Sequence, residues 1–336
     1  MRAALAALLM LAGPAVADPV GDIAKQFDTH SVVQLGEYHR SLQIHMFVQQ
    51  LLHDPRFLCR VDDVAVEFGN SRLQALADTY ASGGSLSEAE IASMWRETSV
   101  PFTWNTPVYR AVYDAVRSAN AAHLCKHPIR LVLADAPLDW SKIRTPKDLE
   151  PFEDRDKAMA DTVEREVLAK HRRAFIITGE FHAEKKTTDE AEGLRTAQLI
   201  ERRHPGSLFV VVTVPSSAAA EALRMGPAPS FRPARDVADA SFAMTKENWT
   251  AATPSKGFKI AEVADGLLYV GGNAMLYPSA MIYLDRAYAT ELRRRTAIVD
   301  ATSGQNFVAV LDDLVREARD QDSLFNPPPP EPANKR

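Results

Sequence analysis

The sequence predicts an α/β fold. We expect a mostly parallel central sheet with helices on both faces, plus a helical insertion and a C-terminal extension of a hairpin and helices. The first observation is a series of five short apolar runs, at 31–36, 62–68, 129–134, 174–178 and 208–214. The second is that segments with helical spacing separate these runs. Apolar strands that alternate with helices are typical of a parallel sheet covered on both faces.

The helical segments follow from the spacing of their apolar residues. Residues 40–53, 154–171 and 187–203 are expected helices, and in the second of them apolar side chains recur every four residues. The segment 71–120 is the helical insertion, with breaks at Gly83-Gly84 and at Pro101. Within it, Ser85 followed by Glu88 is expected to form a capping box.

The chain after residue 215 is less regular. Prolines at 227, 229 and 233 predict a long loop. Residues 258–271 are expected to form a hairpin around Asp265-Gly266. Helices are expected at 286–296 and 305–319. No domain boundary is visible, so the sequence predicts one domain over 18–324 and a disordered, proline-rich tail over 325–336.

The first 17 residues have the features of a secretory signal peptide. A positive Arg2 precedes an apolar segment of about ten residues, and Ala15-Val16-Ala17 supplies a cleavage pattern of small residues. We therefore expect cleavage after Ala17 and a periplasmic or secreted protein. No integral membrane segment is expected after cleavage, because no internal apolar run approaches the ~20 residues needed to span a bilayer.

Composition and motifs exclude several functions. The net charge of −5 and the pI near 6.0 give no basic field to attract phosphates, so we expect no nucleic-acid partner. No glycine-rich dinucleotide or P-loop motif occurs, so no nucleotide cofactor is expected. No Gly-x-Ser-x-Gly motif occurs, which disfavours a standard serine hydrolase.

Two cysteines, Cys59 and Cys125, each precede one of the apolar runs. If those runs are neighbouring parallel strands, both thiols lie at the same edge of the sheet. An exported protein meets oxidising conditions, so a disulfide between them is one expectation. Two unrelated thiols are the alternative.

Charged residues and histidines follow the predicted strands where each one ends. Glu37 and His39 follow the first strand, Glu67 ends the second, Asp135 the third, and His182 follows the fourth. The carboxyl edge of an open parallel sheet is where ligands bind. The first and fourth ends also repeat one pattern, Gly-Glu-aromatic-His, as GEYH at 36–39 and GEFH at 179–182. The sequence therefore predicts a functional site at this edge.

These residues allow more than one chemistry. If the first two strands pair, Glu37 and Glu67 are adjacent, and one of their pKa values is raised unless a cation lies between them. With His39 and His182 they form a candidate set of ligands for a divalent metal. Equally, a histidine oriented by a carboxylate could take a proton from water. Solvated carboxylates and structural histidines are the plainer alternative.

The order of these motifs resembles a known family. GEYH, then His45 on a helix, then VAVEF, then Arg155-Asp156-x-x-Met159-Ala160, then TGEFH is similar to the erythromycin-esterase/ChaN-like/Tiki superfamily. The pattern is closest to the ChaN-like haem-binding uptake domain, within a branch of uncharacterised secreted relatives. The resemblance covers about residues 30–215.

The resemblance implies different activities in different branches. Esterase-like members are metal-independent hydrolases in which Glu and His activate water, Tiki-like members are metal-dependent proteases, and ChaN-like members are haem-binding lipoproteins. This chain lacks the lipoprotein cysteine of the last branch. Arg155 is expected to stabilise an oxyanion or to hold carboxylates. His45, Asp135 and Tyr38 are expected ligand-binding residues, with Asp135 orienting a site residue and Tyr38 a haem ligand if haem binds.

Two functions remain open. The first is an exported hydrolase in which Glu37, His39, Glu67, Arg155 and His182 activate water, on a divalent metal or without one, to cleave an ester or amide. The alternative is a haem-binding protein that uses the same cleft. The expected partner is a small molecule or a peptide in either case, and the sequence does not indicate an oligomeric state.

Overall fold

The computed structural model describes residues 17–100, 103–186, 193–237, 241–244, 249–251, 258–272, 274–276, 280–304 and 306–325. Its centre is a seven-stranded sheet in the order β3-β2-β4-β1-β5-β10-β6. All neighbouring strands are parallel except β10 and β6, which are antiparallel. The mostly parallel α/β fold predicted from the sequence is confirmed.

The five apolar runs form the first five strands. They are β1 (Val32–Glu37), β2 (Asp63–Asn70), β3 (Arg130–Asp135), β4 (Ala174–Gly179) and β5 (Leu208–Thr213). All their residues are buried except Arg130, because helices cover both faces of the sheet. Their pairing is parallel, so all five carboxyl ends lie at one edge.

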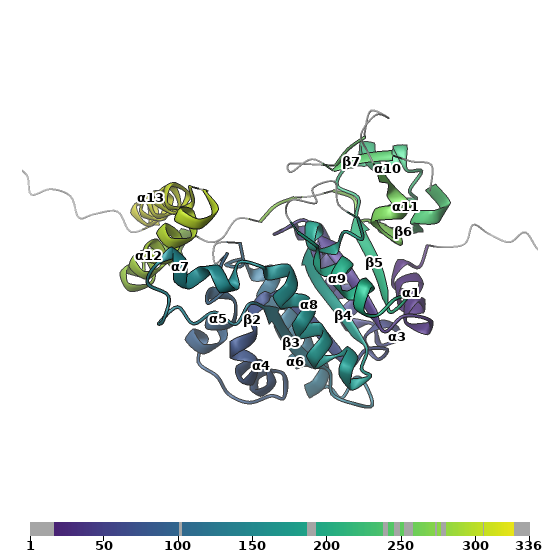
Figure 1. Cartoon of the computed structure of the whole chain (residues 1–336), viewed down its shortest axis with the longest axis horizontal. Coiled ribbons are helices and arrows are strands. Elements are labelled where there is room, and N and C mark those ends of the chain that lie inside the picture. Colours follow the sequence, from purple (N-terminus) through teal and green to yellow (C-terminus); the bar gives the residue numbers. More distant parts are fainter. Residues whose placement is uncertain are drawn as a thin grey trace, which may run out of the picture.

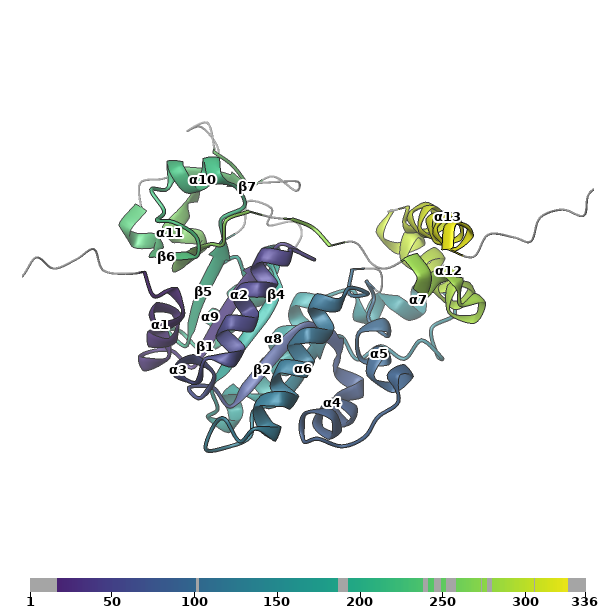
Figure 2. The ribbon, with the colours of Figure 1, turned by 180° about the vertical axis from the view of Figure 1, so that it is seen from behind.

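Helices from different parts of the chain cover the two faces. Helices α8 (Arg155–Glu166) and α9 (Thr196–Arg203) lie in front of the sheet in Figure 1. Helices α2 (Leu42–His53) and α6 (Pro107–Ala121) lie on the other side, in front of it in Figure 2. Two separate apolar clusters correspond to these two faces, because alternate side chains of each strand point to opposite sides.

The strand order corrects one expectation. Strands β1 and β2 do not pair, because β4 lies between them and pairs with both. Glu37 at the end of β1 lies opposite Gly179 of β4. Glu37 and Glu67 are therefore not adjacent residues of paired strands, because β4 with Gly179 separates them.

The insertion between β2 and β3 is helical, as predicted. It contains α4 (Gln74–Ala81), α5 (Glu88–Arg96) and α6. The capping box at the start of α5 is formed by Ser87 and Glu90, and not by Ser85 and Glu88 as the sequence analysis expected. The motif therefore starts two residues later, where the Ser87 hydroxyl accepts the backbone N–H of Glu90 at 3.2 Å and the Glu90 carboxylate accepts the N–H of Ser87 at 2.7 Å.

The expected hairpin at 258–271 is wrong. Residues Phe258–Lys259 form β9 of a small separate sheet, with β7 (Ser241–Met244) and β8 (Trp249–Ala251). A short helix, α11 (Ile260–Val263), follows, and then β10 (Gly266–Tyr269) joins the main sheet beside β5. The Asp265 carboxylate accepts the N–H of Val210 at 2.8 Å, so Asp265-Gly266 leads a strand into the sheet instead of turning a hairpin.

The described chain ends in two long helices, α12 (Arg286–Ser303) and α13 (Phe307–Phe325), close to where the sequence predicts them. In Figure 1 they lie on the opposite side of the molecule from the group that contains β6 (Ser230–Pro233), β7, α10 (Ser217–Ala222) and α11. None of the described helices is long and apolar enough to cross a membrane.

The shorter helices complete the layers. They are α1 (Pro19–Ala24), α3 (Pro55–Leu58) and α7 (Pro146–Leu149). The expected signal peptide and tail fall almost entirely on residues 1–16 and 326–336, which lie outside the described residues. The first part of the helix expected at 187–203 also lies outside them, up to residue 192.

A disulfide joins Cys59 and Cys125. Cys59 follows α3 and Cys125 lies between α6 and β3, so the bridge is at the amino edge of the paired strands β2 and β3. It is therefore at the opposite edge from the predicted site.

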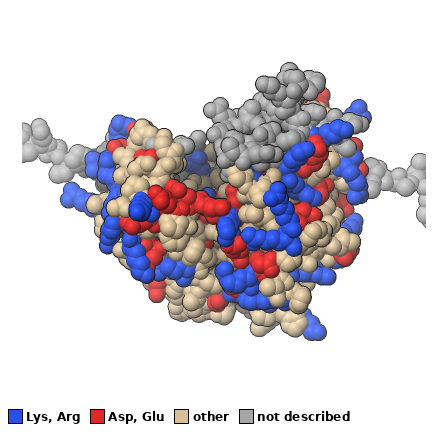
Figure 3. All heavy atoms as spheres, in the orientation of Figure 1, with Lys and Arg blue, Asp and Glu red and all other residues tan. Residues whose placement is uncertain are grey.

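Charges of both signs are interspersed on the face seen in Figure 3. On α8 and α9 they form surface ion pairs, such as Lys157 and Arg203 with Asp161. Exposed ion pairs of this kind each contribute little to the stability of the fold, so we assign them no functional role.

Candidate functional site

Glu37 is the centre of one half of the site. It is 2% exposed, and both of its carboxylate oxygens face histidines. His39 Nδ1 lies 3.2 Å from one oxygen, and His45 Nε2 lies closer still to the other. Burial alone would raise the pKa of Glu37, but the two imidazoles outweigh it and hold that pKa below its ordinary value. The ionised carboxylate only accepts, so His39 carries its proton on Nδ1 and donates it to Glu37.

Aromatic side chains enclose this half. The His45 ring packs edge to face against Tyr109 of α6, with ring centres 4.8 Å apart. The His39 ring packs in the same way against Trp104, also at 4.8 Å. Trp104 is fully buried, whereas the His39 side chain is 37% exposed. His39 is therefore the member of this half that reaches solvent.

Glu67, in the last part of β2, is the centre of the other half. Its carboxylate accepts the backbone N–H of Gly179 at 2.5 Å and Nη2 of Arg155 at 2.8 Å, and it lies 3.4 Å from Nε2 of His182. Glu67 is fully buried, which would raise its pKa. The charges of His182 and Arg155 reverse this effect and hold the pKa of Glu67 well below its ordinary value.

His182 lies between two carboxylates. Its Nδ1 is 2.7 Å from Asp156, and its Nε2 faces Glu67. Burial would lower the pKa of His182, but these two negative charges raise it to about 10. Asp156 is itself held by the N–H and hydroxyl of Thr196, at 2.6 and 2.7 Å. His182 is therefore an imidazolium at neutral pH and cannot take a proton from water.

Arg155 links Glu67 to Asp135. Its Nε and Nη2 donate to Asp135 at 2.9 and 3.0 Å, and Nη2 also donates to Glu67. Asp135 is fully buried, and this burial raises its pKa in spite of the adjacent guanidinium. The guanidinium thus joins the end of β3 to the end of β2 through charge-assisted hydrogen bonds.

Gly179 is where the two halves meet. A Cβ at this position would lie 2.8 Å from Nε2 of His39 and 3.3 Å from a carboxylate oxygen of Glu67. Only glycine permits this approach without displacing the imidazole. His39 Nε2, the nitrogen that does not face Glu37, therefore lies beside the glycine whose N–H holds Glu67.

The structure thus brings the predicted site residues together in two groups. Glu37, His39 and His45 form one, and Glu67, Arg155, Asp135 and His182 form the other. His45 is six positions after His39, a spacing that does not place both on one helical face, yet both histidines reach Glu37, each at a different oxygen of its carboxylate. Tyr38 packs against both apolar clusters beside these groups.

The proposed metal set of Glu37, His39, Glu67 and His182 does not fit a metal ion. Within the described part of the chain, no three His, Cys, Asp or Glu side chains gather in the arrangement that a metal requires. Both nitrogens of His182 already face carboxylates, and Glu67 is occupied by Arg155 and by the backbone of Gly179. The cations that neutralise these carboxylates are side chains of the protein.

The predicted haem ligands do not fit an axial role either. His45 is 2% exposed and its Nε2 faces Glu37. Tyr38 packs against the apolar clusters, and Nδ1 of His39 is engaged by Glu37. The other ring nitrogen of His39, Nε2, lies beside Gly179.

Several participants in the site were missed by the sequence analysis. Asp156 directly follows Arg155 in the motif on which the family resemblance depends, and its place in that motif could have identified it as a site residue. Thr196 and Trp104 offered no signal, because both reach the site through contacts between segments far apart in the chain. Gln34, inside β1, donates to Thr178 at 2.9 Å and to the carbonyl of His182 at 3.1 Å. The sequence signal for Gln34 was its position as a polar residue within an otherwise apolar strand.

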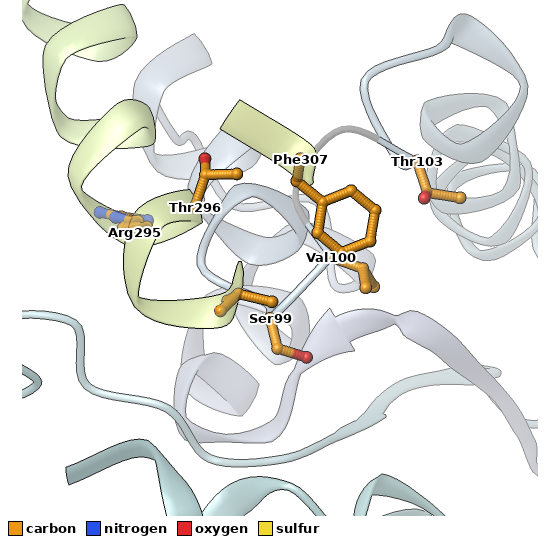
Figure 4. Close-up of a pocket in the computed structure, with 7 residues that line it drawn as sticks. Ser99, Val100, Thr103, Arg295, Thr296 and Phe307 are labelled. Carbon is orange, nitrogen blue, oxygen red and sulfur yellow. The ribbon is translucent and has the colours of Figure 1, made fainter. Parts of the chain in front are cut away.

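A small cavity lies away from these residues. It has a volume of about 50 Å³ and lies between the segment after α5 and the last two helices. Figure 4 shows Val100 and Phe307 close together at this cavity, with Thr296 of α12 beside them. The space suffices for a few water molecules. Its lining does not include the Glu37 or Glu67 groups.

Comparisons with known proteins give the fold. No family model matches the chain, and no curated protein sequence matches it. A solved structure of a succinoglycan biosynthesis protein has a TM-score of 0.58 at 11% identity, over 76% of this chain and 91% of that one. The erythromycin esterase EreC, in an open conformation, has a TM-score of 0.52 at 11% identity, over 76% of this chain and 93% of that one.

A more distant similarity is to ChaN of Campylobacter jejuni, a haem-binding structure, with a TM-score of 0.37 at 15% identity over 57% of this chain and 85% of that one. The first two similarities show that this chain has the fold of erythromycin esterase. The resemblance predicted from the motifs is therefore confirmed at the level of fold, across three quarters of the chain.

Proposed function

We propose that this chain, which shares its fold with erythromycin esterase, is a hydrolase that cleaves esters with His39 as the general base. The observation that carries the proposal is the pairing of His39 Nδ1 with the buried, ionised Glu37. In the tautomer with its proton on Nδ1, His39 has a lone pair on Nε2, which lies beside Gly179, and the His39 side chain as a whole is 37% exposed. A histidine oriented by a buried carboxylate is a general arrangement for taking a proton from water.

His182 and Arg155 supply the positive charge. Both are held between carboxylates, so they are fixed in place before any substrate binds. Fixed charges of this kind stabilise negative charge that develops during a reaction, because the protein does not need to reorganise. Both nitrogens of His182 face carboxylates, and Nε and Nη2 of Arg155 donate to Asp135 and Glu67, so these two cations act through their charge and not through a direct hydrogen bond to substrate.

The chemical steps follow from these assignments. Nε2 of His39 takes a proton from water as the water oxygen attacks the ester carbonyl. The carbonyl oxygen becomes negatively charged, and the imidazolium of His182 stabilises it. The protonated His39 then gives its proton to the leaving alcohol as the C–O bond breaks, which yields a carboxylic acid and an alcohol. Glu37 stabilises the transient positive charge on His39 throughout.

The test is ester hydrolysis by the purified chain from residue 18. We would assay a panel of p-nitrophenyl and naphthyl esters with the wild type, Glu37→Gln and His39→Gln. Removal of the base or of its orienting carboxylate is expected to lower kcat by about 100-fold or more. His127→Gln is the matched control, because His127 is exposed and precedes β3 at the other edge of the sheet. Equal rates for all four proteins, including no hydrolysis by any of them, would rule out the proposal.

Export is a second part of the proposal. The predicted signal peptide would bring the mature chain to the periplasm or outside the cell, where the Cys59–Cys125 disulfide is chemically stable. N-terminal sequencing of the protein produced by a bacterial host tests it. A mature N-terminus at Asp18 is expected, and retention of Met1 would contradict it.

A further inference from the structure

We propose that the C-terminal segment holds His39 in its working orientation, and that Gln43, Asn105 and Tyr288 are the positioning residues through which it acts. None of these three is a candidate for contact with the reacting atoms. The inference rests on the proposed role of His39 as the base. It assigns a role to the part of the chain after β10, which the site described above does not use.

The first point of attachment is a short strap, residues 274–276, which lies against the loop after His39. The N–H of Leu42 donates to the carbonyl of Ala274, and the N–H of Leu276 donates to the carbonyl of Arg40, both at 2.8 Å. Between them, Ser41 and Met275 form an antiparallel bridge. The side chain of Gln43 accepts the N–H of Ala274 at 2.7 Å. The strap therefore fixes the loop by backbone bonds on both sides of Ser41.

This loop needs such support because of its backbone conformation. Arg40, the residue directly after His39, has a φ of 66°. A non-glycine residue in this left-handed region is strained, and such residues persist when their surroundings hold them in place. The hydroxyl of Tyr109 accepts the N–H of Arg40 at 2.8 Å, and the strap binds its carbonyl. Without the strap, part of this support is lost.

The second point of attachment acts through the wall of the site. Trp104 packs against the His39 ring, and its neighbour Asn105 is bound on two sides. The side-chain oxygen of Asn105 accepts from the indole N–H of Trp95 at 3.3 Å and from Nε of Arg96 at 3.2 Å. The side-chain amide nitrogen of Asn105 donates to the hydroxyl of Tyr288 at 3.0 Å. Tyr288 is in the first turn of α12.

Helix α12 thus reaches the site from the far end of the chain. The guanidinium of Arg96 lies 4.5 Å from the centre of the Tyr288 ring, which fixes the tyrosine over the same segment. Figure 4 shows Thr296 of α12 and Phe307 of α13 beside Val100, in the segment that leads to Trp104. The strap and α12 therefore converge on His39 from two sides, one through its loop and the other through its ring.

The experiment reads the tautomer of His39 directly. We would compare ¹⁵N imidazole NMR spectra of the wild type and of a Gln43→Ala, Tyr288→Phe double variant, with the His39 signal assigned by its loss in His39→Gln. The wild type is expected to show one tautomer, with the proton on Nδ1. The double variant is expected to show a mixture of both tautomers, because the ring is no longer held against Glu37. Its kcat on a p-nitrophenyl ester is expected to fall about 10- to 100-fold with KM unchanged.

Conservative variants and a control complete the test. Gln43→Glu keeps an acceptor for the N–H of Ala274, so it is expected to restore the single tautomer in the Tyr288→Phe background in part. Gln50→Ala changes an exposed position of α2, the helix that also contains Gln43, and this variant is expected to match the wild type in both tautomer and kcat. A folded double variant that keeps the single Nδ1–H tautomer of the wild type overturns the inference. A wild type with that tautomer but no esterase activity instead refutes the proposed function alone.

Discussion

Two histidines of this site have different partners although they end the same motif. His39 and His182 both close a Gly-Glu-aromatic-His pattern, and the sequence therefore suggests equal roles for them. The difference comes from their contacts, because one carboxylate faces His39 whereas two face His182. The two carboxylates beside His182 come from β2 and from the start of α8, which are far from it in the chain. No local pattern around either histidine reveals such contacts.

The first prediction concerns Gly179. We expect Gly179→Ala to lower esterase kcat by about 100-fold, because the added methyl group would lie only 2.8 Å from Nε2 of His39 and displace the imidazole. Gly226→Ala is the control, since a Cβ there meets nothing closer than 3.6 Å. Steady-state kinetics of both variants on one ester decide the matter. Equal loss in both, or no loss in Gly179→Ala, contradicts the placement of His39.

The second prediction concerns the charge on His182. Its pKa is raised from 6.5 to about 10 in the folded protein, so its ion pairs contribute their full stability below pH 6.5. That contribution is lost as the pH rises through about 10. The difference in unfolding free energy between the wild type and His182→Gln is expected to be on the order of 4 kcal/mol at pH 6 and to shrink steadily toward pH 10. Urea unfolding at several pH values measures it, and a difference independent of pH would show that His182 is not charged.

At the scale of elements, the sequence predicted β1 to β5 but not the neighbours of each of these strands. The runs that became β1 to β5 are apolar because both faces of a parallel strand are buried, which is a local property. The position of β4 between β1 and β2 depends on which helices pack on which face, and no property of the three runs fixes it. The failed hairpin has the same origin. Asp265 resembled a turn residue, but its carboxylate binds the backbone of β5, a strand some 55 residues earlier.

The third prediction concerns the disulfide between α3 and the connection into β3. It closes a loop with a sequence separation of 66 residues, so it is expected to stabilise the fold by about 4 kcal/mol through the unfolded chain. Urea unfolding of a Cys59→Ser, Cys125→Ser double variant measures this loss. Because the bridge lies at the edge opposite the site, esterase activity of the folded variant is expected to equal that of the wild type. Loss of activity in a protein that remains folded would contradict this separation.

At the scale of the whole molecule, the sheet has two unequal parts. Strands β1 to β4 end at the site, and with β5 they are buried on both faces, whereas β10 and β6 attach at one edge through short pairings. Asp265 adds a side-chain link between the parts to the pairing of β10 with β5. It binds the N–H of Val210 on β5 and the ammonium of Lys185, which follows the turn that holds His182. Nothing in the sequence indicated this link, because its three residues are far apart in the chain.

The last prediction is that Asp265→Ala loosens the C-terminal part of the sheet while leaving the centre intact. The backbone N–H of Val210 loses its acceptor, and Lys185 loses its partner at 2.8 Å, so both β10 and the turn after β4 are less well held. Hydrogen exchange measured by mass spectrometry is expected to speed up over 260–269 and 183–186, with β1 to β4 unchanged. Asp236→Ala is the control, because Asp236 is on the same part of the chain and its ion pair with Arg235 is a long one of 3.9 Å at the surface. Faster exchange throughout the sheet would instead show that the two parts unfold as one unit, and the site would then depend on the C-terminal extension for its stability as well as for its geometry.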